Sequence, residues 1–192
     1  MNEINAIDLE SMKINMMIYK NNLSLKNKIG RLIWKITYLI FFRPFPSRFF
    51  RKWRVLVLKI FGAKISFKSS VHASAKIWAP WNLEMGDYST ISDDVDCYNV
   101  AKVVLGNSVT VSQRAFLCTA SHNIRSLNHE LVTAPIVIED GAWVAAESYV
   151  GMNLTIGKGA VIGARAVVVK NVDSLTIVGG NPAKIIGYRQ IS

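Results

Sequence analysis

A period of six residues runs through the C-terminal two thirds of this chain and sets narrow limits on its fold. The period is clearest over residues 138–173, which read IEDGAW, VAAESY, VGMNLT, IGKGAV, IGARAV and VVKNVD. The first residue of every block is Ile or Val, and the fifth is Ala, Ser, Leu, Ala, Ala or Val. A helix repeats every 3.6 residues and a strand every two, so neither element explains this period. Hexapeptide periodicity is typical of a β-solenoid.

Earlier blocks follow the same rule in other phases, at 65–76, 85–96 and 105–122, which indicates short insertions between them. We therefore predict an all-β solenoid in which three blocks make one triangular coil of roughly 18 residues. The aliphatic first residue fills the interior, and the small fifth residue fits near a corner. Coils stack at the strand spacing of about 4.8 Å. About six coils fit in a predicted domain over 65–178.

Two segments interrupt the repeat. The first is NIRSLNHELVTAP, residues 123–135, which we expect to form a polar loop. The second is the tail, residues 179–192, which opens with the turn signal GGNP and continues as an apolar and basic segment. Function often concentrates in segments that leave a rigid scaffold.

The first 64 residues form a basic extension. They contain 13 Lys and Arg against 3 Asp and Glu, a net charge of +10, whereas residues 65–192 contain 10 of each. The whole excess of positive charge therefore lies in residues 1–64.

We expect two helices in this extension, over 28–42 and 48–61. Proline at 44 and 46 ends the first, Ser47 offers an N-terminal cap to the second, and Gly62 ends it. Such helices can cap the open end of a solenoid, or form a cationic amphipathic surface that contacts anionic lipid through residues 28–61. Apolar residues recur with helical spacing at positions 29, 32, 33, 36, 39 and 40, and at 49, 50, 53, 56, 57 and 60.

The sequence favours a cytoplasmic location, with the inner face of the cytoplasmic membrane as a further expectation. The N-terminal MNEINAIDLE is acidic and polar, unlike a signal peptide. The longest apolar run is interrupted by Lys35 and is too short to span a bilayer. Cys97 and Cys118 have neither metal-site nor redox-motif spacing, which fits a reducing compartment. No nucleic-acid motif accompanies the basic charge.

Four stretches together resemble the hexapeptide-repeat acyltransferases: LCTASHN, IVIEDGAWVAAESYV, GARAVVVKNV and VGGNPAKII. More narrowly, residues 28–188 resemble the colanic-acid-type acetyltransferases of exopolysaccharide synthesis, relatives of the maltose and galactoside O-acetyltransferases. The resemblance implies a left-handed parallel β-helix and a homotrimer with active sites between subunits. It also implies transfer of an acetyl group from acetyl-CoA to a hydroxyl of a sugar or a lipid-linked sugar, with no metal.

His122 matches the catalytic histidine of that family. A sugar hydroxyl is a poor nucleophile, and an imidazole can accept its proton as the oxygen attacks the thioester. The next residue, often Asp in the narrower family, is Asn123 here. Cys118 lies four residues before His122, so both would face the same side of a strand, and a Cys/His nucleophilic pair stays open as an alternative.

The resemblance also supplies residues for both substrates. Lys184 would meet phosphate oxygens near the nucleotide end of acetyl-CoA. Arg165 replaces a usual glycine, and Glu147 a usually neutral residue, so both depart from the family pattern. Asp94 and Asn99 match positions that hold the acceptor sugar. The other matches to acetyl-CoA contacts are Trp143, Ala146, Ala164, Val169 and Lys170.

Three other functions compete with sugar O-acetylation. An N-acetyltransferase acting on an amino sugar would use the same base and groove. A metal-dependent hydrase on the same fold would need three converging histidines, and His72, His122 and His129 do not have that family's spacing. A non-catalytic scaffold would not need a histidine at position 122.

Overall fold

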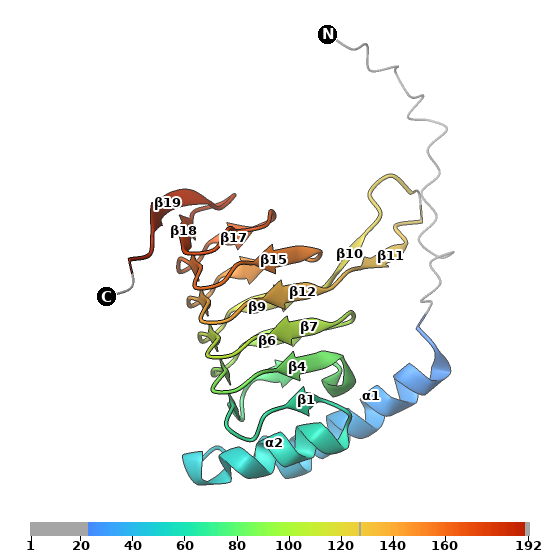
Figure 1. Cartoon of the computed structure of the whole chain (residues 1–192). Helices are drawn as coiled ribbons and strands as arrows, with labels where there is room; N and C mark the ends of the chain where they lie inside the picture. The colour runs from blue at the N-terminus through green and yellow to red at the C-terminus, as the bar shows by residue number, and fades with distance from the viewer. Residues whose placement is uncertain (1–22, 127, 191–192) are drawn as a thin grey trace.

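The computed structural model describes residues 23–126 and 128–190, so the part of the predicted extension at residues 1–22 lies outside the described residues. The described chain is a parallel β-solenoid of about six turns with a helical segment across one end (Figure 1). The fold class predicted from the six-residue period is confirmed.

Three parallel sheets form the walls of the solenoid, and each coil adds one strand to each wall in turn. We call the walls A, B and C. Wall A contains β1 (Lys64–Ile65), β4 (Leu83–Met85), β7 (Val103–Leu105), β12 (Ile136–Ile138) and β15 (Leu154–Ile156). Wall B contains β2 (Ser70–Val71), β5 (Thr90–Ile91), β8 (Thr110–Val111), β13 (Trp143–Val144), β16 (Val161–Ile162) and β18 (Thr176–Gly179). Wall C contains β3 (Lys76–Ile77), β6 (Asp96–Tyr98), β9 (Phe116–Cys118), β14 (Tyr149–Val150) and β17 (Val167–Val168).

The register of the strands explains the phase shifts of the repeat. Lys64 lies beside Glu84, so an early coil takes 20 residues, whereas Val137 lies beside Thr155 and a late coil takes 18. Part of the extra length in the first coil is a 3₁₀ turn, Pro80–Asn82, between walls C and A. The predicted short insertions are therefore real and lie at a corner.

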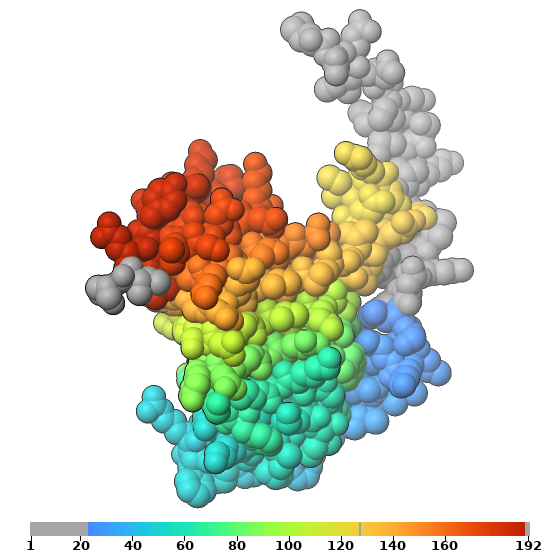
Figure 2. Space-filling model, in the orientation of Figure 1, coloured from blue at the N-terminus to red at the C-terminus, as the bar shows by residue number. Residues whose placement is uncertain are grey.

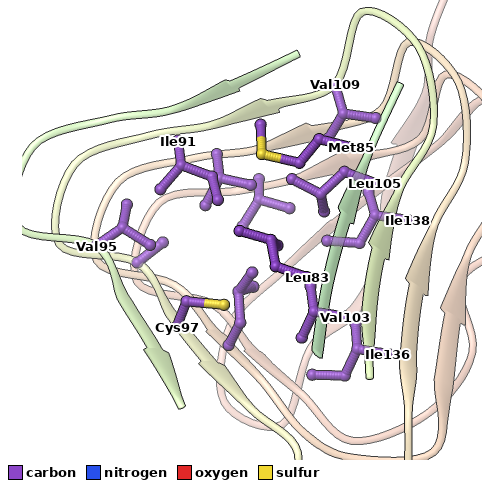
Figure 3. Packing of buried hydrophobic residues seen from close by; sticks show 14 of the residues in the cluster. Leu83, Met85, Ile91, Val95, Cys97, Val103, Leu105, Val109, Ile136 and Ile138 are labelled. Carbon is purple, nitrogen blue, oxygen red and sulfur yellow. The ribbon is translucent and has the colours of Figure 1, made fainter. Parts of the chain in front are cut away.

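The interior contains the residues that the repeat places first and fifth in each block (Figure 3). Leu105, Val111, Ile138 and Val144 are at most 1% exposed, and the alanines in the fifth position are equally buried. Cys97 belongs to this packing, and burial raises the pKa of its thiol. Cys97 is therefore a core residue.

Two segments extend from the regular coils. The predicted loop 123–135 is partly ordered into a hairpin, because β10 (Ala120–His122) pairs antiparallel with β11 (Leu131–Thr133). At the other segment, Gly180 has a φ of +93° in the predicted turn, and β19 (Lys184–Tyr188) returns antiparallel to β18. The hairpin stands out from the side of the solenoid, and β19 lies at the end opposite the helices (Figures 1 and 2).

The two predicted helices are present. The first is α1 (Leu25–Thr37), continued by a π-helical turn over Tyr38–Phe42, and it begins where Ser24 accepts a hydrogen bond from the Asn27 N–H. The second is a 3₁₀ turn, Arg48–Phe50, followed by α2 (Arg51–Ile60). Ser47 caps the second helix and Gly62, with a φ of +89°, ends it, as predicted.

The side of the helices that packs on the solenoid differs from the one expected. The apolar positions that we counted on the first helix, including Leu32 and Ile36, are 49–60% exposed. The contact with the first coil comes instead from Trp34, Tyr38 and Phe42, with the Trp34 indole N–H donating to the Ile77 carbonyl at 2.7 Å. The helices therefore cap the solenoid, but with a second apolar face that the spacing analysis did not separate from the first.

The second helix shows the same arrangement. Val55 and Leu58 are fully buried, whereas Phe49 is 88% and Ile60 71% exposed. Arg54 is also buried, and its guanidinium donates to the carbonyls of Val71, Phe45 and Ser47. The bond to Val71 joins the helical segment to wall B, and the other two bonds hold the turn before α2 in place. No helix of the described residues is long and apolar enough to cross a bilayer.

The division of the chain into segments 1–64, 65–178 and 179–192 stays a prediction. In the described residues, the coils begin at β1 and the last strand of wall B ends at Gly179.

Leu105 provides a test of the interior packing. Replacing this side chain, which is 1% exposed, with Ala should lower the free energy of unfolding by about 2–5 kcal/mol, because a cavity forms between coils. Urea denaturation followed by circular dichroism measures the change. Ile124→Ala, at a residue 90% exposed, is the control and should stay within about 0.5 kcal/mol of the parent. Equal effects of the two substitutions would contradict the assigned interior.

Candidate active site

His122 ends β10, at the point where the chain leaves wall C for the hairpin. Its ring is exposed, and its Nδ1 lies 2.6 Å from the backbone carbonyl oxygen of His129. A carbonyl oxygen only accepts hydrogen bonds, so we assign the ring proton to Nδ1. In the neutral imidazole the basic lone pair is then on Nε2. The hairpin therefore sets both the orientation and the tautomer of the predicted base.

Local turn geometry fixes the loop that supplies this carbonyl. The Asn123 N–H donates to the Glu130 carbonyl at 2.8 Å, and the Asn123 side chain accepts from the Arg125 N–H at 3.1 Å. Asn123 thus serves as a turn residue, a role that its amide oxygen fills as well as a carboxylate would. His129 has a φ of +45°, and it is its backbone carbonyl that faces the Nδ1 of His122.

Cys118 does not have the environment of a nucleophile. Its side chain is buried, and its Sγ donates to the Ala120 carbonyl at 3.1 Å. Burial, followed by a hydrogen bond with Cys118, raises the pKa of Tyr149 to about 12, so this neighbouring phenol stays protonated and cannot act as a base toward Cys118. The geometry favours His122 over a Cys/His pair.

The residues matched to acetyl-CoA run from wall B, around its corner with wall C, to the far end of wall C, and we call this set the coenzyme strip. Trp143 lies on β13 and is 46% exposed, and its indole N–H donates to the Ser112 hydroxyl at 2.9 Å. Ala146 and Ala164 lie in corner turns of consecutive coils, where the Arg165 N–H donates to the Ala146 carbonyl. Small side chains at these two turns leave the backbone accessible to an extended ligand.

The strip continues to its basic end. Val169 and Lys170 are exposed directly after β17, at the far edge of wall C. Lys184 is brought to the same region because the neighbouring Ala183 N–H donates to the Val167 carbonyl at 2.8 Å. The structure thus brings all six matched residues onto two coils and the tail, with an aromatic ring near one end and lysines near the other.

A column of charged residues follows the same corner. Asp94, Arg114, Glu147 and Arg165 occupy equivalent turn positions with φ between 56° and 60°. Glycine adopts this left-handed conformation without strain, which explains the usual glycine at the position of Arg165. Here Glu147 accepts from Arg165 at 2.5 Å and lies 2.6 Å from the Arg114 guanidinium, so the two departures from the family pattern compensate each other. The hydrogen bond from Arg165 is the main cause of a lowered pKa of Glu147.

The two residues matched to the acceptor site differ in their surroundings. Asp94 is exposed and lines a cavity of about 500 Å³ between α1 and strands β3 and β6, with Trp78, Tyr98 and Arg31 among its walls. Asn99 is fully buried, and its side-chain amide bonds both the N–H and the carbonyl of Ala79. The contacts of Asn99 join two coils, so this geometry is against a direct contact with the acceptor.

The three histidines do not converge. The His72 Nδ1 lies 2.9 Å from the Asp93 carboxylate on the first two coils, whereas His122 and His129 belong to the hairpin. Among the residues described, no three His, Cys, Asp or Glu side chains are placed to hold a metal ion.

Comparison with known proteins identifies which of the functions found on this fold the chain has. WcaF of Escherichia coli, named for acetyl transfer in colanic acid biosynthesis, is 36% identical over 163 residues, which cover 85% of this chain and 89% of WcaF. The chain belongs to this acetyltransferase family. It is an acetyltransferase that uses acetyl-CoA. No protein-family model matches the sequence.

Further relatives of this acetyltransferase agree in fold. The galactoside O-acetyltransferase of Escherichia coli is 27% identical over 124 residues, covering 63% of this chain and 55% of that protein. The crystal structure of a Vibrio cholerae hexapeptide-repeat acetyltransferase with acetyl coenzyme A has a TM-score of 0.77 and 25% identity, covering 89% of this chain and 93% of the other. The family named by resemblance from the repeat and motifs is confirmed.

Several residues of this site escaped the sequence analysis. The His129 carbonyl and the Ser112 hydroxyl act through tertiary contacts that no local motif marks. The sequence does contain a signal for the pairing of Arg114 and Arg165 with Glu147. Arg114 and Glu147 occupy the same place in their hexapeptide blocks, so the solenoid register alone aligns their side chains.

Replacing Glu147 with Gln tests the corner column. The ionised carboxylate is favoured in the folded state because its pKa is lowered, so its contribution is present above the ordinary carboxyl pKa of about 4.3 and is lost as pH falls through the lowered value. Glu147→Gln should lower Tm by no more than a few degrees at pH 7, since exposed ion pairs are weak. Melting curves from about pH 7 to pH 3 should show the two proteins converge at low pH. A constant difference in Tm would contradict this assignment.

Proposed function

We propose that this acetyltransferase transfers the acetyl group of acetyl-CoA to a sugar hydroxyl in exopolysaccharide or capsule synthesis, with His122 as general base. The observation that carries the proposal is the contact of His122 Nδ1 with the His129 carbonyl, which places the basic lone pair on Nε2. The similarity to WcaF, which is named for colanic acid biosynthesis, supports the exopolysaccharide setting.

The chemistry needs one base and no covalent enzyme intermediate. Nε2 of His122 accepts the hydroxyl proton as the acceptor oxygen bonds to the thioester carbonyl carbon. The carbon–sulfur bond then breaks, and the imidazolium returns its proton to the departing thiolate. The Nδ1 proton stays bonded to Nδ1 throughout, and its hydrogen bond to the His129 carbonyl stabilises the imidazolium. The products are an acetyl ester and free coenzyme A.

The coenzyme strip, which crosses from wall B to the far edge of wall C, fits an extended coenzyme. Trp143 offers an exposed ring, Ala146 and Ala164 leave backbone groups open to the pantetheine arm, and Val169 follows at the edge of wall C. We assign Lys170 and Lys184 to phosphate oxygens, because an ammonium group suits a phosphate at a solvent-accessible site. The tail from Gly179 completes this strip through Lys184.

Two copies of the chain are needed to complete the site in this proposal. His122 leaves wall C toward wall A, whereas Trp143 and the two alanines lie on wall B and its corner with wall C. Different corners of one solenoid meet when identical solenoids pack side by side about a three-fold axis. This separation supports a homotrimer with sites between neighbouring subunits.

The acceptor side is defined by the cavity beside Asp94. Its aromatic walls, Trp78 and Tyr98, with ring centroids 5.7 Å apart, suit the apolar face of a sugar, and Asp94 can accept from sugar hydroxyls. We propose a sugar or a lipid-linked sugar as acceptor, and a cytoplasmic enzyme that acts at the inner face of the cytoplasmic membrane. The buried Asn99 side chain bonds the Ala79 backbone across two coils, so we propose no direct contact between Asn99 and the acceptor.

Removal of the His122 imidazole tests the mechanism. His122→Ala should lower kcat by at least about 10²-fold while acetyl-CoA still binds, because general-base catalysis is lost and the coenzyme strip is intact. Free-thiol release is followed over a panel of sugars, nucleotide-sugars and amino sugars. His129→Asn is the matched control, since it keeps the backbone carbonyl and tolerates the positive φ, and it should retain activity within a few-fold.

The product separates the competing functions. A base-labile acetyl ester on a neutral sugar is the expected result. Acetylation of an amino sugar with no turnover of neutral sugars would replace O-transfer by N-transfer, and full activity of His122→Ala would remove His122 from the mechanism.

Lys184 tests the orientation of the coenzyme. Lys184→Gln should raise KM for acetyl-CoA about 5- to 10-fold with little change in kcat, because a charge-assisted bond to phosphate is lost. Acetyl-pantetheine, which lacks the nucleotide, should react equally with parent and variant. Lys158→Gln, an exposed lysine outside the strip, is the matched control and should leave KM unchanged. An equal rise of KM in both variants would contradict the orientation.

A further inference from the structure

The helical segment exposes an apolar surface that its role as a cap does not explain. We call this surface the outer helical face; its side chains are between 38% and 88% exposed. Both helices turn their buried sides to the first coil and lie across the end of the solenoid, so the opposite sides point away from the body (Figures 1 and 2). The outer helical face consists of Leu25, Ile29, Leu32, Ile33, Ile36, Ile40, Phe41, Phe49, Trp53, Leu56 and Ile60.

This face is continuous between the two helices. On α1 its members recur every three or four residues, which places them in one stripe along the helix. The Trp53 indole N–H donates to the Phe41 carbonyl at 2.7 Å and joins α2 to the end of the π-helical turn. Contiguous apolar patches of this kind on a soluble domain mark interaction sites.

The charge around the face is of one sign. Residues 23–64 contain 11 Lys and Arg and no Asp or Glu. Some of these cations are used internally, as Arg54 is by the carbonyls of Val71, Phe45 and Ser47. Lys26, Lys28, Lys35, Arg43, Arg48 and Lys52 are exposed and form no ion pair with a described residue.

We propose that the outer helical face docks on a membrane that contains anionic lipid. An apolar stripe flanked by lysines is the pattern by which a helix lies in the interface, with its apolar side chains below the headgroups and its cations among them. A second copy of the same face would bring two strongly cationic surfaces together, and their repulsion disfavours that pairing. The docked face gives a place of action to the proposed transfer to lipid-linked sugars, but it rests on the helices alone.

The geometry also allows several faces to act together. In the trimer proposed above, identical solenoids pack with their axes along the three-fold, so all three helical ends point the same way. Three faces would then meet one membrane, and binding gains from multivalency without any new contact.

Vesicle co-sedimentation of the full chain tests the proposal. With phosphatidylcholine vesicles containing about 30% phosphatidylglycerol, the protein should pellet, and it should pellet poorly with phosphatidylcholine alone. The double variant Leu32→Gln/Ile36→Gln should weaken binding by at least about 10-fold. Both side chains are more than half exposed, so the variant should keep the parent melting temperature.

Two further variants complete the experiment. Lys28→Glu/Lys35→Glu should also weaken binding and reduce its dependence on salt. Ile185→Gln/Ile186→Gln removes two exposed isoleucines at the opposite end of the molecule and should pellet as the parent does. Acetyl transfer to a soluble acceptor should be unchanged in Leu32→Gln/Ile36→Gln, so loss of docking is distinguishable from loss of the proposed activity.

Three results would overturn the proposal. One is no pelleting of the parent with anionic vesicles. Another is equal pelleting of the parent and Leu32→Gln/Ile36→Gln. The third is a lower oligomeric state of that variant in light scattering with no change in vesicle binding, which would make the face an interface between copies of the chain.

Discussion

Each coil of this protein depends on the coils beside it, because only stacking covers its interior side chains and pairs its short strands. Wall strands are two to four residues long and could not persist alone, but in-register parallel pairing joins them through all the coils. The aliphatic residues that begin each hexapeptide meet in one continuous core. Stability is then a sum of neighbour contacts, and the two ends need protection. The helices give that protection at one end, and β19, paired with the last strand of wall B, gives it at the other.

Function is placed where this stacking is interrupted. His122 ends β10, which leaves the solenoid and, among the described strands, pairs only with β11, so its ring is exposed while the preceding strand, β9, stays paired with β6 and β14. The hairpin then supplies the carbonyl that fixes its tautomer. The coenzyme strip, in contrast, depends on uninterrupted stacking. Regular stacking brings residues 18 positions apart, such as Ala146 and Ala164, onto one corner. The regular coils therefore provide a repetitive surface for a long ligand, and the hairpin that interrupts them carries the proposed catalytic histidine.

The sequence predicted the solenoid well because the rule for the interior is local: one aliphatic and one small residue in every six. It predicted the helices and their caps for the same reason. Periodicity could not tell which apolar face of α1 would meet the solenoid, because Trp34 and Tyr38 are four residues apart just as Leu32 and Ile36 are. The family resemblance matched Asn99 to a position that holds the acceptor sugar. In the structure its side chain is buried and forms two hydrogen bonds with the Ala79 backbone, which only the stacking of coils brings together. Contacts between distant residues decided both cases.

We propose that the hairpin aims Nε2 of His122 at the thioester bound along the coenzyme strip. A crystal structure of the protein with coenzyme A tests it most directly. The account predicts a trimer in which the coenzyme lies over Trp143, Ala146 and Ala164, its phosphates near Lys184. It also predicts a thiol within about 6 Å of Nε2 of His122, which leaves room for one acceptor oxygen hydrogen-bonded to Nε2 and in contact with the thioester carbon. Coenzyme bound on another surface, or a thiol distant from every His122 in the assembly, would contradict it.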